Sequence, residues 1–141
     1  MYDNTVIYLI ECKDTSVSNT YVGHTTNYGL RCIRHETEVK NSKRKLYTFI
    51  RDHGGWSNWC MRPLSIVTCK NKGDACLEEL YWYHKICPTL NVYVPGINYY
   101  NKAIKSRKLY ERRKEIIDRI NRILVWLCLG MAANAIKTLV I

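Results

Sequence analysis

Hydrophobic residues in the first 70 positions form short runs that are typical of β-strands. Residues 5–12 (TVIYLIEC) are β-branched and aromatic, and residues 20–24 (TYVGH) have the same character after the polar turn KDTSVSN. These two runs predict an antiparallel hairpin. Residues 61–69 (MRPLSIVTC) predict a third strand, with a proline near its start, where a missing ladder donor is tolerated.

Apolar residues at helical spacing separate these predicted strands. A helix is expected from about Leu30 to about Lys40, after a turn closed by Asn27 and Gly29. A second helix is expected around three apolar positions and should stop at a glycine pair. These positions are Leu46, Phe49 and Ile50, followed by Gly54 and Gly55.

A third helix is expected after the last predicted strand. Asp74 is its expected N-cap, and Pro88 should end it. The order of elements predicts an α/β fold with a small three-stranded antiparallel sheet flanked by helices. Residues 1–100 are expected to form this domain, and residues 101–141 a C-terminal extension of one or more long helices.

The extension is basic first and apolar afterwards. Residues 102–122 carry nine basic and three acidic residues, a net charge of +6, and are a candidate nucleic-acid-binding arm. The apolar residues 123–141 have three open explanations: packing or self-association through an a/d seam, a membrane anchor, or an interfacial amphipathic helix or incidental C-terminal extension. The seam consists of Ile117, Ile120, Leu124, Leu127 and Met131. Asn134 and Lys137 interrupt the apolar run, so we do not expect a membrane span.

The net charge and the cysteines limit which classes of partner and which cellular compartment we expect. The net charge is +10, from 22 basic and 12 acidic residues, which indicates a polyanionic partner such as nucleic acid or an anionic membrane surface. Seven cysteines without a CxxC pair, and an N-terminus unlike a secretion signal, predict reduced thiols in an intracellular protein of the cytoplasm or nucleus. His84 and Cys87 have the spacing of half a zinc site, and no second half is visible.

Residues that could take part in catalysis occur in a fixed order along the chain. The ordered motifs are VIY at residues 6–8, YVG at residues 21–23, RxxxH at residues 31–35, ExxW at residues 79–82 and PTLN at residues 88–91. Over residues 5–98 this set resembles the GIY-YIG nuclease family, as does the segment HGGWSNW before the third strand. Val6 departs from the first glycine of the family motif, and the loop between the two motif tyrosines is slightly long.

The resemblance implies a metal-dependent DNA endonuclease that hydrolyses phosphodiester bonds. Glu79 would hold one Mg²⁺ or Mn²⁺ ion, and Arg31 would bind the phosphate. Tyr8 would act as general base, and Tyr21 would orient water or phosphate. His35 lies four residues after Arg31, hence on the same helix face, and would assist through hydrogen bonding or proton transfer. No small-molecule cofactor is expected.

A further set of residues is expected to contact the DNA without reading its bases. It comprises Gly23, His24, Arg34, Lys43, Arg44 and Asn91. Asn91 would support the site or contact phosphate by resemblance, and it could equally make a turn after Pro88.

Each of these side chains also has a purely structural explanation. Tyr8 and Tyr21 could be strand packing, Arg31 and Glu79 could belong to solvated helix faces, and His35 could be a surface or cap residue. Three further aromatics could stack on bases, although core packing is favoured; these are Tyr47, Trp56 and Trp59. The alternative function is a nucleic-acid-binding module of the same fold that cuts weakly or only with a partner. A membrane-associated basic protein rests on the apolar tail alone.

Overall fold

The computed structural model describes residues 2–138, and for residues 123–138 the backbone alone. The described chain divides between Tyr100 and Asn101 into two compact units. The elements in chain order are β1 (Tyr2–Cys12), β2 (Thr20–Thr25), α1 (Tyr28–Asn41), α2 (Lys45–Asp52), the 3-10 turn η1 (Trp56–Asn58), β3 (Trp59–Cys69), α3 (Lys72–Ile86) and α4 (Ile97–Thr138).

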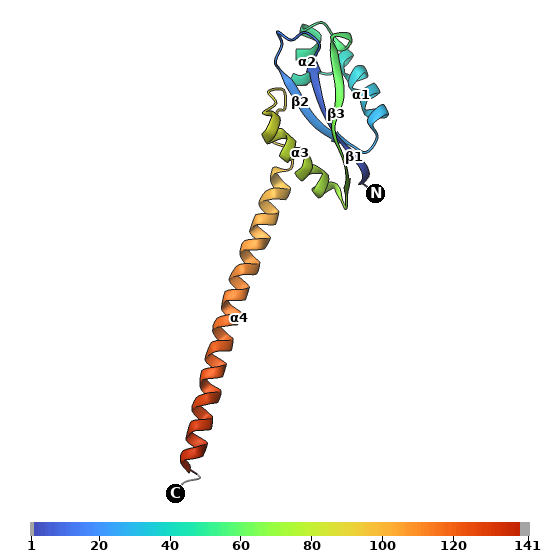
Figure 1. Ribbon diagram of the computed structural model, residues 1–141. Helices are drawn as coiled ribbons and strands as arrows, with labels where there is room; N and C mark the ends of the chain where they lie inside the picture. Colours follow the sequence, from blue (N-terminus) through green and yellow to red (C-terminus); the bar gives the residue numbers. More distant parts are fainter. Residues whose placement is uncertain (1, 139–141) are drawn as a thin grey trace. The chain divides into compact units, whose positions relative to one another are not determined.

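The strands form one antiparallel sheet in the order β2-β1-β3 (Figure 1). β1 occupies the centre because its residues 5–10 are continuously apolar or small, and all of them are buried. The predicted α/β class and three-stranded antiparallel sheet are confirmed. β1 begins three residues earlier than expected, and β2 continues one residue further than expected, through Thr25.

Alternate residues of β1 serve two separate cores. Tyr8 and Ile10 pack against residues of α1 and α2 on one face, and Ile7 and Leu9 pack against residues of α3 on the other. Figure 1 shows α1 and α3 on opposite sides of the strands. The first unit is therefore a three-layer α/β/α arrangement, and each layer contributes candidate site residues.

Pro63 lies at an irregular point of the edge strand β3. The register passes from Tyr8 opposite Pro63 to Ile7 opposite Ser65, which leaves Leu64 as an extra residue. A proline without a backbone N–H is tolerated at such a bulge on an edge strand.

Asparagine side chains begin both α1 and α3. The Leu30 N–H donates to Asn27 Oδ1 at 3.0 Å, and α1 starts two residues before the predicted position. The prediction of Asp74 as the N-cap of α3 is wrong. Asn71 is the N-cap, and its Oδ1 accepts the Asp74 N–H at 3.1 Å, while the Asp74 carboxylate accepts the Lys70 N–H at 3.2 Å. Asn71 thus caps an N–H of the first turn, while Asp74 reaches back to the N–H of the residue before the N-cap.

The long C-terminal helix is confirmed as α4, whose residues 101–122 are all exposed. Ile117 and Ile120 of the predicted seam are among them, whereas Leu124, Leu127 and Met131 lie outside the residues whose side chains are described. Within the described part of the chain, no helix has the length and apolar character needed to cross a membrane.

Gly96 connects the segment after α3 to α4, and only glycine suits its position. Its φ is +65°, and a Cβ there would lie 2.4 Å from the Cys76 carbonyl oxygen. Gly96→Ala should therefore lower the free energy of unfolding by about 2 kcal/mol or more. Gly29→Ala is the matched control: its Cβ would meet nothing within 4 Å, and alanine in a helix should stabilise by up to about 1 kcal/mol. Urea unfolding measures both, and equal effects would contradict this placement of Gly96.

Candidate active site

A buried phenol hydroxyl lies at the centre of the candidate site. Tyr8 is fully buried, and its Oη accepts a hydrogen bond from Arg31 Nε at 2.8 Å. The same oxygen lies 3.0 Å from His35 Nε2. Arg31 and His35 reach Tyr8 together because they are four residues apart on α1.

Gly23 makes room for this hydroxyl. It pairs directly with Tyr8 across the β1-β2 ladder, and a Cβ on Gly23 would lie 2.5 Å from Tyr8 Oη. The missing side chain lets the Tyr8 ring lie over β2, the outer strand of the sheet. Gly23 therefore has a packing role in the site, whereas the sequence suggested contact with nucleic acid.

His35 is fully buried between two tyrosines. Its Nδ1 lies 3.1 Å from Tyr47 Oη, opposite the contact with Tyr8. Arginine can only donate, so the Tyr8 proton is left for His35 Nε2. A neutral His35 then carries its proton on Nδ1 and donates it to Tyr47 Oη. Burial separates His35 from solvent, and the Tyr8 hydroxyl links it to Arg31.

Tyr47 is the member of this network that the sequence did not identify. Its place among the apolar residues of α2 indicated core packing, and it is indeed buried. Its hydroxyl forms a hydrogen bond with His35, which lies twelve residues earlier. No local spacing predicts that contact. Trp59 is core, as favoured, and Trp56 stacks beside the His35 ring with centroids 5.9 Å apart.

Burial sets the protonation of these groups. It lowers the pKa of His35 to about 3, with the positive charges of Arg31 and Arg34 acting in the same direction. Burial likewise raises the pKa of Tyr8 and of Tyr21, and Arg31 opposes this without prevailing. Both tyrosines are therefore neutral phenols at neutral pH.

Glu79 comes to the site from α3 on the other side of the sheet. It is 8% exposed, and its Oε2 pairs with His24 Nδ1. His24 follows Gly23 in β2, so strand alternation turns it toward the α3 face. The sequence suggested His24 as a phosphate contact, and its nearest partner is this carboxylate 55 residues away.

A cleft of about 700 Å³ lies beside β2. It is lined by residues of β2, of α1 to α3 and of the segment after α3, including Tyr21, Arg31, Arg44, Glu79, Asn91 and Tyr93. Because β2 is an edge strand, side chains from both faces of the sheet can reach the space beside it. Three predicted catalytic residues line this cleft directly: Tyr21, Arg31 and Glu79.

The other predicted DNA contacts are distributed unevenly. Arg44 lines the cleft, while Arg34 and Lys43 are exposed but do not line it. Asn91 lines the cleft and binds the backbone of β2. Its Oδ1 accepts a hydrogen bond from the Val22 N–H at 3.0 Å, and its Nδ2 donates to the Val22 carbonyl at 2.9 Å. Asn91 therefore supports the edge of β2, while its contact with a phosphate stays a prediction.

The donor set at the cleft limits which metal it could hold. Within the described part of the chain, no three His, Cys, Asp or Glu side chains gather as a metal site. Glu79 supplies one hard carboxylate, which fits Mg²⁺ or Mn²⁺, since these ions keep several waters and take further oxygens from a phosphate. The same donor set does not fit a structural zinc site.

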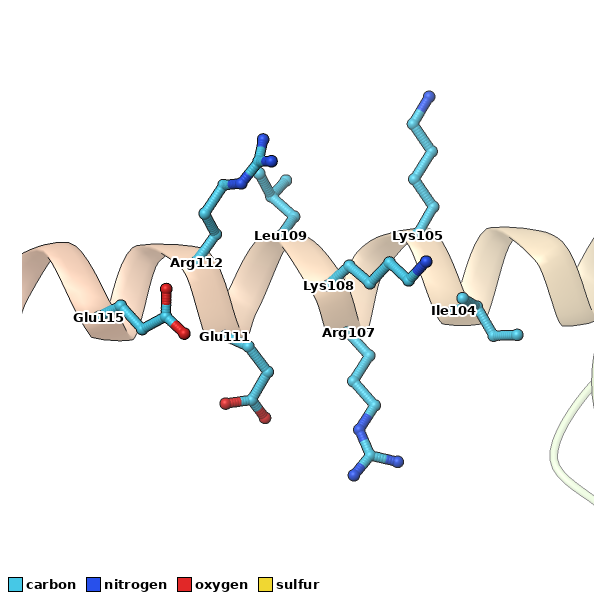
Figure 2. Close-up of a pocket in the computed structure, with 8 residues that line it drawn as sticks. All are labelled: Ile104, Lys105, Arg107, Lys108, Leu109, Glu111, Arg112 and Glu115. Carbon is cyan, nitrogen blue, oxygen red and sulfur yellow. The ribbon is translucent and has the colours of Figure 1, made fainter.

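A second concave region lies on the surface of α4 and is lined by residues between 104 and 115. Figure 2 shows that its side chains all come from this one helix and point in several directions, with Lys105 and Arg107 on opposite sides. No second element encloses a cavity there in the described chain. This region is therefore a basic helix surface and not an enclosed pocket.

Comparison with known protein families, with functionally characterised proteins and with solved structures finds no match to this chain.

The buried neutral His35 should make stability depend on pH. In the unfolded chain a histidine protonates below about pH 6.5, whereas folded His35 resists protonation until about pH 3. Stability from this group is therefore complete above pH 6.5 and is lost as the pH falls from 6.5 toward 3. Between pH 7 and pH 5 the loss should be about 2 kcal/mol.

Urea unfolding of His35→Gln at pH 7 and pH 5 tests this effect, because glutamine can hydrogen-bond but does not titrate. The variant should lose less stability between the two pH values than the unchanged protein. His84→Gln is the control, since it makes the same replacement at an exposed histidine of α3. Equal pH dependence in His35→Gln and the unchanged protein would contradict a buried neutral His35.

Proposed function

We propose that this protein is a metal-dependent DNA endonuclease of the GIY-YIG type. The observation that supports this best is that Tyr21, Arg31 and Glu79 line one cleft although they come from β2, α1 and α3. Their order along the chain is that of the motifs that suggested the family. The proposal requires an anionic substrate, and the net charge of +10 favours one.

Arg31 is the proposed phosphate-binding residue. Its Nε–H is engaged by Tyr8, which fixes the plane of the guanidinium. An arginine carries five N–H donors, so its guanidinium can bond Tyr8 and a phosphate in the cleft at the same time. A charged, preoriented fork stabilises the extra negative charge of the transition state better than a mobile surface arginine does.

The two tyrosines have different proposed roles. Tyr21 lines the cleft, so its neutral hydroxyl can donate to a phosphate oxygen or orient the attacking water. Tyr8 is fully buried and bonded to both Arg31 and His35, which favours a positioning role over the general-base role expected from the family. His35 and Tyr47 complete the support by keeping the Tyr8 hydroxyl satisfied.

Glu79 is the proposed ligand of one Mg²⁺ or Mn²⁺ ion. When bound, such an ion supplies Lewis-acid polarisation of the phosphate and stabilises the leaving oxygen. His24 holds Oε2, which fixes the carboxylate plane and leaves Oε1 for the cleft. A side chain that orients a ligand in this way is a usual part of a metal site.

Basic groups around the cleft are proposed to position the DNA backbone. Arg44 and Lys45 line the cleft, and residues 102–122 of α4 form a separate exposed basic surface with a net charge of +6. Contacts of this kind set the register of the DNA without reading its sequence.

Replacement of Glu79 should stop cleavage while leaving DNA binding in place. Glu79→Gln removes the charge that holds the ion, so nicking of supercoiled plasmid in Mg²⁺ or Mn²⁺ should become undetectable. Glu78→Gln is the matched control, since Glu78 is the adjacent acid and does not line the cleft. Full cleavage by Glu79→Gln, or by the unchanged protein in excess EDTA, would refute the metal-dependent mechanism. Binding without cleavage in the unchanged protein would favour the alternative of a binding module.

Replacement of Arg31 by lysine should reduce the cleavage rate by about 10²–10³-fold, because an ammonium cannot bond Tyr8 and grip the phosphate at once. Arg34→Lys is the control: Arg34 lies one turn along on α1, is exposed and keeps its charge as lysine. Single-turnover cleavage of plasmid DNA measures both. Similar rates for the two variants would show that Arg31 is only a diffuse positive charge.

A further inference from the structure

The segment that follows α3, residues 88–96, is held firmly along the outer side of β2. We call it the strap. The Leu90 N–H donates to the Thr20 carbonyl at 3.0 Å, and the Leu90 side chain is buried. Asn91 adds its two hydrogen bonds to Val22. The start of the strap therefore extends the hydrogen bonding of the edge strand.

Contacts on both sides of the strap restrict it further. The Thr89 carbonyl accepts a bond from Lys45 Nζ at 2.8 Å, and its Oγ1 accepts one from Asn19 Nδ2 at 2.8 Å. At the other end, Gly96 packs so closely on the Cys76 carbonyl that a Cβ would not fit. The strap is thus anchored at both ends.

The tip of this anchored segment is apolar and faces solvent. Val92, Tyr93 and Val94 are 59%, 84% and 36% exposed. Among the described residues, Tyr93 is the most exposed large hydrophobic side chain. An anchored loop usually buries its apolar side chains, because the burial of apolar area is favourable. The exposed apolar tip of the strap therefore indicates a contact surface.

The position of the tip indicates which partner it contacts. Val92 and Tyr93 line the same cleft as Arg31 and Glu79, together with the basic residues Arg44 and Lys45. An aromatic ring among phosphate-binding cations matches the composition of a nucleotide: a flat apolar base next to a charged backbone. An apolar peptide partner would bring no anion to Arg31, Arg44 and Lys45.

We propose that the strap tip is a nucleobase wedge, in which Tyr93 stacks on an unpaired or unstacked base beside the phosphate held in the cleft. This inference rests on the proposed function and adds a substrate preference to it, namely DNA with a bulge, branch or other weakened stack. Rigid side chains inserted at a base step act in this way, and the cost of unstacking is lowest where pairing is already lost. Val92 would support the edge of the base.

The test is fluorescence anisotropy of a labelled DNA duplex with a central three-nucleotide bulge, titrated with full-length protein in EDTA so that no cutting occurs. Tyr93→Ala should bind roughly 5- to 150-fold more weakly, the range observed when a base-stacking aromatic is removed. Tyr93→Phe should bind like the unchanged protein, since stacking needs the ring and not the hydroxyl. Tyr81→Ala, at a tyrosine that is 57% exposed on α3 and outside the cleft lining, should also bind normally.

Salt dependence separates stacking from charge. Tyr93→Ala should keep the slope of log affinity against log salt, because stacking releases no counterion. Arg44→Ala should reduce the magnitude of this slope by about 0.9 for duplex DNA. Unchanged affinity in Tyr93→Ala would overturn the wedge and leave the endonuclease proposal standing. Equal weakening in Tyr93→Phe would also overturn it, by assigning the effect to the hydroxyl. Failure of the unchanged protein to bind any DNA would overturn both proposals.

Discussion

The hydrogen bonding of the Tyr8 hydroxyl is the constraint on which the site depends. This hydroxyl is fully buried on the central strand, where an unsatisfied polar group costs about 1–3 kcal/mol. Arg31 and His35 satisfy it, and Tyr47 satisfies His35 in turn. The chain Arg31–Tyr8–His35–Tyr47 therefore connects the phosphate-binding candidate to the core, so that core packing determines where the guanidinium lies.

The free edge of β2 explains how residues from opposite faces of the sheet come to line one cleft. Tyr8, Tyr21 and Arg31 belong to the side of α1 and α2, whereas Glu79 and His24 belong to the side of α3. A central strand would keep these two sets apart. At an edge strand they meet around its open side, and the strap closes part of that edge with the Leu90 and Asn91 hydrogen bonds.

Burial also determines which ionisable groups of the site are neutral. It raises the pKa of Tyr8 and Tyr21 and lowers that of His35, so these three are neutral at neutral pH. Arg31 is then the proposed phosphate-binding group, and Glu79 the proposed metal ligand. A site with neutral phenols around one fixed cation favours positioning and electrostatic stabilisation over proton removal by a side chain. This is why the general-base role suggested for Tyr8 by family resemblance receives no support from its surroundings.

The sequence by itself determined the elements of this protein and the order of its chemical residues. Continuous apolar runs predicted the strands, helical spacing predicted α1 and α2, and the RxxxH spacing placed Arg31 and His35 on one face. Only the tertiary structure decided that Arg31 borders the cleft while His35 is buried, that Tyr47 bonds His35, and that His24 pairs with Glu79. The physical reason is distance along the chain: periodicity and capping report interactions within a few residues, and even there Asn71 outcompeted Asp74 as a cap. A contact across 55 residues depends instead on strand order and on which face each helix covers, and these are settled by burial of the whole core.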